Sequence, residues 1–289
     1  GSGGSLNFQG ALILSRPGSI TQYYLFIKDM ITIFPNLGFG APMRVTASLV
    51  DLSYNNGLGK VLQRAVPILN DTLSLARMTA CRHANGRDWW LVNHKIGYTN
   101  KIYTHLITPD SIYGPYIQII GGNDNYAQFG WSVFSPDGST FATTTAGMGE
   151  ITLLDFDRCT GTFSNYRAIP TDSNKLSEFL AFSPNSRFLY SGNNEYLFQY
   201  DSLSTNIANS CTMLVNDSIY PPGSSSMVLM PDNKIYRIGW SDPGTNCISV
   251  IDSPDLKAPY CNFHLRSLCF TDSARGIQVG IHSLPNFVN

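Results

Sequence analysis

Apolar and aromatic residues alternate with polar ones in short runs along most of the chain, and this alternation predicts β-strands. Two such runs flank the turn FSPDG at residues 134–138. The same arrangement returns at FSPNS, residues 182–186, and in altered form at LMPDN, residues 229–233. Proline presets the second corner of a type I turn, and Ser, Asp, Asn and Gly suit the other corners. Each copy therefore predicts a β-hairpin, with equivalent corners at Pro136, Pro184 and Pro231.

A third strand follows each hairpin and ends in an acidic residue, and a weaker fourth segment comes after it. The third strands ITLLDFD, YLFQYD and CISVID end at Asp157, Asp201 and Asp252. We expect these carboxylates to cap the next turn by accepting local amide hydrogens. Four short strands in about 45 residues match the size of one propeller blade, whereas a helical repeat of that length needs an apolar period near 3.6.

Two earlier units fit this plan more loosely. One carries Asn85-Gly86 at its hairpin turn, and the earlier one carries Pro17-Gly18 and a third strand that ends at Asp51. In the earliest unit an insertion, MITIFPNLGFGAPM, separates the second and third strands.

The sequence therefore predicts an all-β fold, a β-propeller of four-stranded antiparallel blades with about five blades visible. We expect one domain over residues 1–289, with a closing strand at 273–289. The expected blades span approximately residues 10–72, 73–122, 127–172, 176–218 and 224–272.

Composition narrows the class of protein. Charged residues make up only 13% of the chain, about half the usual share, so the surface relies on Asn, Ser, Thr and Tyr, as suits an extracellular β protein. The net charge is −1 without a Lys/Arg cluster, which argues against nucleic-acid binding because phosphates need a basic footprint. No apolar run reaches membrane-spanning length, so no membrane insertion is expected.

The six cysteines are an even number, which is compatible with an oxidising compartment. Cys247 and Cys261 are equidistant from Pro254, so a hairpin over 247–261 would bring their thiols within bridging reach. Two buried free thiols are the alternative, and the sequence leaves both open.

Candidate catalytic and metal-binding motifs are incomplete. Cys81, His83 and His94 could begin a zinc site, but no second Cys/His pair lies at ligand spacing, and packing is their expected role. Asp155-x-Asp157 lacks the further oxygens and the distal Glu of a calcium loop. The segment GLGK lacks the spacing of a phosphate-binding loop, and GSSSM lacks the nucleophile elbow of hydrolases. We therefore expect no catalytic residue, no metal and no cofactor.

Several phrases, taken in order along the chain, resemble one known family. They are VDLSYNNGLGKV, CRHANGRDWWLVNH, FSPDG, LLDFDRCTG, AFSPNSRFLY, FQYD, MPDNKIYR, SVIDSPDL and LPNFVN. Together they resemble the N-terminal WD-like β-propeller of secreted proteins of Bacteroidota, often labelled gliding-motility-associated or type IX-secreted. The resemblance implies a seven-bladed propeller, so this chain is either part of such a propeller or closes with fewer blades. It also implies neighbouring domains in a larger parent protein and a secreted or cell-surface location. It brings no established catalytic residues.

A binding surface is expected on the loops that join successive blades and the second to third strands, because function concentrates on loops held by rigid strands. These loops are rich in Asn, Asp, Ser and Gly, and they carry few ionisable groups for acid–base catalysis. The candidate binding residues are Asn123, Asp124, Tyr126, Asp172, Asn193, Asn194, Tyr220 and Trp240.

We accordingly expect a non-catalytic extracellular module, not an enzyme, that recognises an unknown protein or glycan or acts as a scaffold. The alternative is a metal-dependent propeller enzyme, such as a lactonase or a lyase. That alternative needs acidic or histidine side chains from several blades at the central axis. The inner strands FGWSVF, SEFLAF and SSMVLM offer only Glu178.

Overall fold

The computed structural model describes residues 9–34, 39–97, 99–122, 130–145, 149–171, 177–193, 195–216, 225–239 and 247–269. Apart from its last two residues, the chain forms two compact units. The first unit contains Gly1–Ser132 and Leu154–Arg167, and the second contains Val133–Leu153 and Ala168–Phe287. The predicted closing strand at 273–289 lies outside the described residues.

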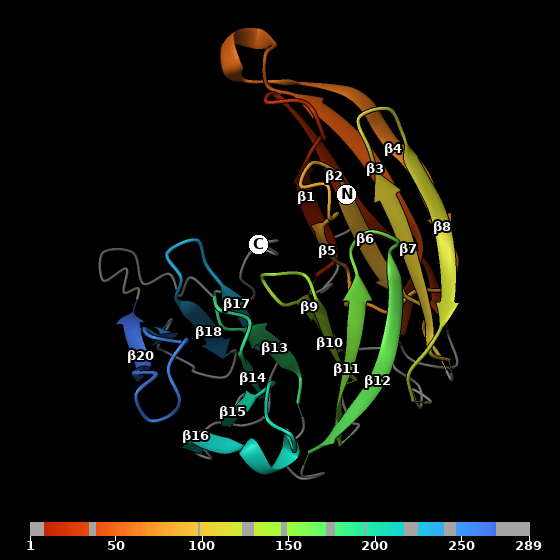
Figure 1. Ribbon diagram of the computed structural model, residues 1–289. Coiled ribbons are helices and arrows are strands. Elements are labelled where there is room, and N and C mark those ends of the chain that lie inside the picture. The colour runs from red at the N-terminus through yellow and green to blue at the C-terminus, as the bar shows by residue number, and fades with distance from the viewer. Residues whose placement is uncertain are drawn as a thin grey trace. The chain divides into compact units, whose positions relative to one another are not determined.

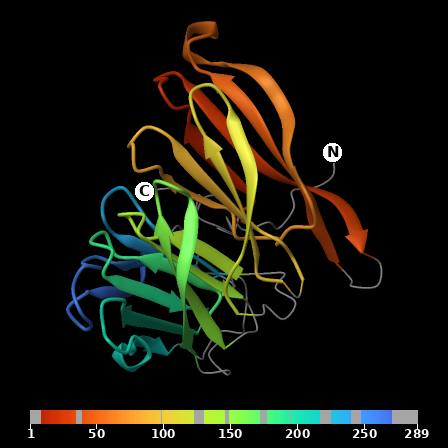
Figure 2. The same ribbon diagram turned by 45° about the vertical axis from the view of Figure 1, so that its right-hand side comes forward.

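Five four-stranded antiparallel sheets make up the described chain, and the predicted all-β propeller architecture is confirmed (Figures 1 and 2). The first sheet has β1 (Ala11–Ser15), β2 (Gln22–Phe34), β3 (Phe39–Asp51) and β4 (Lys60–Asn70). The second has β5 (Thr79–Arg82), β6 (Trp89–His94), β7 (Lys101–Ile107) and β8 (Ile112–Ile119). The third has β9 (Gly130–Phe134), β10 (Thr140–Thr145), β11 (Glu150–Asp157) and β12 (Thr162–Pro170).

The fourth sheet has β13 (Phe179–Phe182), β14 (Phe188–Gly192), β15 (Tyr196–Asp201) and β16 (Thr212–Asn216). The fifth has β17 (Ser225–Leu229), β18 (Ile235–Gly239), β19 (Cys247–Ile251) and β20 (Phe263–Cys269). In every sheet the strands are neighbours in chain order, as a meander requires. Two single 3₁₀ turns, η1 (Asn55–Gly57) and η2 (Ala208–Ser210), are the helical elements of the described residues.

The hairpin between the first two strands of each sheet uses one and the same turn. In FSPDG the N–H of Gly138 donates to the carbonyl oxygen of Ser135 at 2.7 Å. Bonds of the same type close the other four turns at 2.9–3.1 Å, from Gly86 to His83, from Ser186 to Ser183, from Asn233 to Met230 and from Ser19 to Arg16. The repeated turn in the sequence is therefore a repeated structural corner.

The predicted insertion between the second and third strands of the first sheet is not a separate loop. Strands β2 and β3 run on through most of it, and their pairing continues to Phe34 opposite Phe39. The segment alternates β-branched and aromatic residues, so it lengthens the hairpin instead of interrupting it. The expectation of an insertion between the strands is wrong in this respect.

Most of the third-strand carboxylates cap the following turn, as predicted. Asp51 accepts from the N–H of Ser53 at 2.9 Å, and Asp157 accepts from that of Cys159 at 2.8 Å. The N–H of Leu203 donates to Asp201 at 3.2 Å. Asp252 differs, because its carboxylate accepts from Lys234 Nζ at 2.7 Å.

A buried core joins the first two sheets within the first unit. It includes Leu12, Phe26, Val45, Leu91 and Ile107, all at most 2% exposed. Along β3 the core takes alternate residues, Val45, Ala47 and Leu49, because successive side chains of a strand point to opposite faces. The core gives the two sheets a fixed relation on which a site can be built.

A second contact recurs between neighbouring sheets, and we call it the clamp: the turn between the third and fourth strands of one sheet binds the hairpin of the preceding sheet. Arg16 Nη2 donates to the carbonyl oxygen of Pro109 at 2.7 Å. The N–H of Ala84 donates to the carbonyl oxygen of Arg158 at 3.1 Å. Within the second unit, the N–H of Asn185 donates to the Asp255 carboxylate at 2.8 Å.

The disulfide of the fifth sheet differs from the predicted one. Cys247 is bonded to Cys269, and Cys261 is a buried free thiol. Cys247 and Cys269 face each other in the register of β19 and β20, where Ile251 pairs with Phe263. The turn between these strands is therefore centred near residue 257 and not at Pro254, which is why symmetry about Pro254 selects the wrong partner.

Candidate functional site

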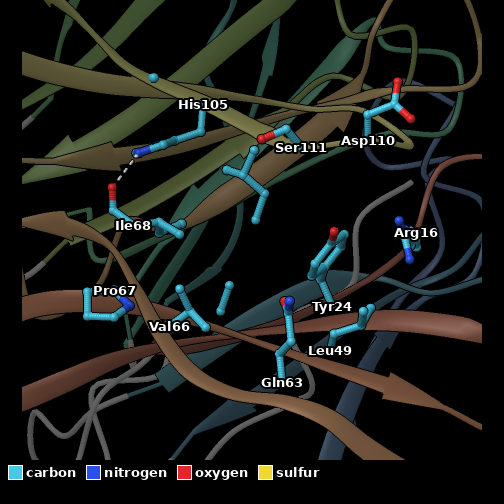
Figure 3. A pocket seen from close by; sticks show the side chains of 13 residues that line it. Arg16, Tyr24, Leu49, Gln63, Val66, Pro67, Ile68, His105, Asp110 and Ser111 are labelled. Atoms are coloured by element: carbon cyan, nitrogen blue, oxygen red, sulfur yellow. Dashed lines mark hydrogen bonds between the residues drawn. The ribbon is translucent and has the colours of Figure 1, made fainter.

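A pocket of about 460 Å³ opens between the first and second sheets within the first unit (Figure 3). Strands β2, β3 and β4 supply one wall, and β7, β8 and the turn between them supply the other. The lining residues are Arg16, Tyr24, Ala47, Leu49, Gln63, Val66, Pro67, Ile68, His105, Asp110, Ser111, Ile112 and Gly114. The volume lies in the range of small-molecule sites, which is about 300–1,000 Å³.

Irregular pairing of β4 explains how so many of its residues reach the pocket. The register of β3 and β4 shifts on either side of Ala47, and Ala65 has a left-handed backbone with φ of 49°. Ser48 Oγ accepts from the N–H of Ala65 at 2.9 Å, which supports this bulge. Bulges break the strict alternation of a strand, so consecutive side chains from Val66 to Ile68 can line one cavity.

A bulge also shapes the opposite wall. On β8, Gly114 has φ of +114°, and a Cβ there would lie 2.8 Å from the carbonyl oxygen of Thr104. Only glycine fits this conformation and this close approach. The bulge lies opposite His105 and leaves its side chain free to reach across to the first sheet.

His105 bridges the two walls. Its Nε2 lies 3.1 Å from the carbonyl oxygen of Ile68 on β4, and the side chain is 1% exposed (Figure 3). A carbonyl oxygen can only accept, so Nε2 carries the proton and Nδ1 carries the lone pair. Burial lowers the pKa of His105 to about 4. The imidazole is therefore neutral near pH 7.

Arg16 forms one end of the pocket beside Tyr24 (Figure 3). Its Nε and Nη2 both donate to the carbonyl oxygen of Pro109, at 3.1 and 2.7 Å. Its Nη1 donates to Gln22 Oε1 at 2.6 Å, and Gln22 donates in turn to Asp51 at 2.8 Å. The guanidinium group is thus fixed by neutral acceptors at the junction of the two sheets.

Three polar groups of the lining make no hydrogen bond to any described residue. They are the hydroxyl of Tyr24, the side-chain amide of Gln63 and the hydroxyl of Ser111. Figure 3 shows the Tyr24 hydroxyl and the Gln63 amide directed into the space between the walls. The lining also includes the buried apolar residues Ala47 and Leu49, which are 4% and 7% exposed. The pocket therefore combines free donors and acceptors with an apolar surface.

The lining contains Ser, His and Asp, but they do not form a hydrolytic triad. Such a triad needs the histidine to accept from the serine while a carboxylate holds its other nitrogen. Here Nε2 of His105 is committed to Ile68, and Nδ1 has no partner among the described residues. The Asp110 carboxylate is exposed and points away from the imidazole (Figure 3).

The candidate metal ligands take structural roles. Cys81 is buried, and burial raises the pKa of its thiol to about 12. His83 stacks on Trp90 with a centroid distance of 5.7 Å, and its Nε2 lies 3.1 Å from the carbonyl oxygen of Cys159. Burial lowers the pKa of His94. Within the described ranges, no three His, Cys, Asp or Glu side chains gather in a way that would hold a metal ion.

Most of the predicted binding residues lie outside the described residues: Asn123, Asp124, Tyr126, Asp172, Asn194, Tyr220 and Trp240. Asn193 is described, and its side chain accepts from the N–H groups of Glu195 and Tyr196, both at 2.9 Å. It therefore caps the turn between β14 and β15. Its part in binding stays a prediction, as does that of the other seven.

Sequence reasoning missed the pocket because its walls come from positions far apart in the chain. Tyr24, Gln63 and His105 each read as one more strand residue, and nothing in the spacing joins them. A signal was present at Gly114-Pro115, because both residues are unfavourable inside a regular strand. They mark the bulge that forms the wall of the cavity.

Comparisons with known proteins extend the fold assignment. No family model matches the chain, and no curated protein sequence matches it. A solved protein from Lactobacillus plantarum is 12% identical with a TM-score of 0.53, and the match covers 85% of this chain and 67% of the other. The periplasmic gluconolactonase of Pseudomonas aeruginosa is 14% identical with a TM-score of 0.48, over 80% and 64% of the two chains. The Cps50 (Swd1) β-propeller domain of Myceliophteria thermophila is 12% identical with a TM-score of 0.47, over 76% and 62%.

The match therefore spans about two thirds of each of these proteins. At such identities the likeness concerns the fold. In the part of the chain that the structure describes, no helix has the length and apolar character needed to cross a membrane.

The expectation that this chain is not an enzyme must be corrected. It rested on the scarcity of ionisable groups in the predicted binding loops. The matched solved structures include a gluconolactonase. The structure also places Arg16, His105 and Asp110 around one cavity, away from the loops on which the expectation was based.

Proposed function

We propose that this chain is a recognition domain that binds a small polyhydroxylated ligand, of the size of a sugar, in the pocket between its first two sheets. The observation that carries the proposal is the set of free polar groups, on Tyr24, Gln63 and Ser111, in a cavity whose lining also contains apolar side chains. A sugar ring has hydroxyl groups on its rim and C–H groups on its faces, and it needs this combination. Unused donors and acceptors in a concave site are what fix the orientation of such ligands.

The wider setting of the domain is also a proposal. The low charge and the ordered phrases described above support a secreted or cell-surface protein of Bacteroidota, with type IX secretion and neighbouring domains. Peptides of the parent protein should then appear in the surface or culture-supernatant fraction of the source cells by mass spectrometry. Confinement of those peptides to the cytosolic fraction would refute this setting.

The binding proposal is tested by saturation-transfer NMR with glucose, galactose, N-acetylglucosamine and glucuronate at millimolar concentration. Tyr24→Phe removes one hydroxyl and Gln63→Ala removes one amide, and each should weaken the bound sugar about fivefold to tenfold, as for the loss of one hydrogen bond. Tyr113→Phe is the matched control, because Tyr113 lies on β8, is 47% exposed and does not line the pocket.

Two results would refute the proposal: no transfer to any of these sugars, or transfer that both pocket variants leave unchanged. The same spectra record any new product signal, so that binding and turnover are read in one sample.

A further inference from the structure

The charge of the pocket narrows the class of ligand, and this inference rests on the proposed function. Arg16 is half-buried and lines the cavity. Its described partners are the carbonyl oxygen of Pro109 and the amide oxygen of Gln22, which are both neutral. A guanidinium group has five N–H donors, and three of them are used here. Two donors and the whole positive charge therefore remain for a ligand.

Neighbouring carboxylates do not neutralise this charge directly. Asp51 bonds to Gln22 and to Ser53, so only the Gln22 amide connects it to Arg16. Hydrogen bonds from Gln22 and Ser53 lower the pKa of Asp51 to about 2. Asp51 is therefore not an ion-pair partner of Arg16.

Asp110 is the one acidic residue of the lining. Its carboxylate points out of the cavity in Figure 3. The hydrogen bond to Asp88 and, to a smaller extent, the negative charges of Asp88 and Asp110 raise the pKa of Arg87. His105 is neutral near pH 7 and adds no charge of its own.

We infer that the ligand carries one carboxylate beside its hydroxyl groups, as a sugar acid does, and that Arg16 binds this carboxylate. Guanidinium and carboxylate groups match in geometry, and their charge-assisted hydrogen bonds are about twice as strong as neutral ones. The free groups of Tyr24, Gln63 and Ser111 are left for the hydroxyls of the same molecule. One guanidinium with two free donors suits a monoanion better than a phosphate, which usually gathers several cations or backbone N–H groups.

The test compares four probes by titration calorimetry on the intact chain: glucuronate, glucuronamide, glucose and glucose 6-phosphate. Glucuronamide has nearly the shape of glucuronate but no charge, so the wild-type protein alone decides the question. We expect glucuronate to bind at least about tenfold tighter than glucuronamide, in line with the strength of hydrogen bonds to charged groups. Equal affinities would overturn the inference and leave the proposed function standing.

Variants locate the charge. Arg16→Gln should abolish the preference for glucuronate over glucuronamide. The matched control is Arg64→Gln, because Arg64 is exposed on β4 of the same sheet and does not line the pocket. Circular dichroism checks that the Arg16→Gln variant, which loses a contact of the clamp, is still folded.

Tighter binding of glucose 6-phosphate than of glucuronate would overturn the carboxylate assignment in favour of a phosphate. A preference that survives Arg16→Gln would overturn the role of Arg16. Absence of binding by all four probes would overturn this inference, and the proposed function would fall with it if the sugars of the NMR test also do not bind.

Discussion

Replacement of His105 should change how stability depends on pH. The imidazole is 1% exposed and neutral, and burial lowers its pKa from 6.5 to about 4. When the pKa of a histidine is lower in the folded chain than in the unfolded chain, there is a pH range in which only the unfolded chain binds a proton. In that range the free energy of unfolding falls. This loss is absent above about pH 6.5, grows as the pH falls, and is complete below about pH 4.

The size of the effect follows from the same two pKa values. Each pH unit over which only the unfolded chain is protonated costs about 1.4 kcal/mol. Between pH 7.5 and pH 5.0 the expected loss from His105 is therefore about 2 kcal/mol, and between pH 7.5 and pH 4.0 it is about 3 kcal/mol. Other groups also titrate in this range, so only the difference between wild type and variant isolates His105.

Urea unfolding followed by tryptophan fluorescence measures this difference, because Trp89, Trp90 and Trp131 are at most 7% exposed. His105→Gln keeps an N–H donor for the carbonyl oxygen of Ile68 but cannot titrate. Its free energy of unfolding should fall by about 2 kcal/mol less than that of the wild type between pH 7.5 and 5.0. His105→Phe loses the hydrogen bond as well, so it should be less stable at pH 7.5 yet show the same weakened pH dependence. Equal pH dependence in wild type and both variants would refute the burial argument.

Three further predictions concern stability. Gly161→Ala should destabilise the chain by about 2–4 kcal/mol in thermal or urea unfolding, because a Cβ there would lie 2.5 Å from the Trp90 ring. Gly86→Ala has nearly the same positive φ but nothing within 4 Å, so it should cost only about 1–2 kcal/mol, and equal losses would contradict the steric account. Cys247→Ala should lower the free energy of unfolding by about 3 kcal/mol, because it removes a disulfide that spans 22 residues. Non-reducing peptide mapping should recover Cys247 linked to Cys269, and a Cys247–Cys261 peptide would contradict the register of β19 and β20. Tyr190→Phe removes a buried hydroxyl that donates to the carbonyl oxygen of Pro254 at 2.8 Å, and it should lower the free energy of unfolding by about 1–3 kcal/mol. Tyr260→Phe, at a side chain that is 76% exposed, should leave the unfolding midpoint unchanged. Equal midpoints for the two variants would show that the bond to Pro254 contributes nothing.

The fold is readable from the sequence because its signals are local. A type I turn needs only four consecutive residues, so Pro136, Pro184 and Pro231 mark their corners without knowledge of the rest of the chain. The same holds for the aspartates that end the third strands, because their partners lie two residues further on. Repetition at nearly constant spacing then converts single turns into an architecture.

The pocket and the disulfide depend on distant residues, and sequence reasoning failed at both. Arg16 and Pro109 are 93 positions apart, and His105 and Ile68 are 37 apart, so only the packing of two sheets brings them together. The partner of Cys247 depends on where the irregular turn between β19 and β20 is centred. An error of three residues in that centre was enough to select the wrong cysteine.

The clamp limits how this repeat can be rebuilt. Arg16 with Pro109, Ala84 with Arg158, and Asn185 with Asp255 are chemically different solutions to one contact. A chimaera that exchanged single sheets as interchangeable modules would separate each hairpin from the turn that recognises it. Grafts that carry a hairpin together with the third-to-fourth-strand turn of the next sheet keep the matched pair. The segment that can be transplanted therefore does not coincide with one four-stranded sheet.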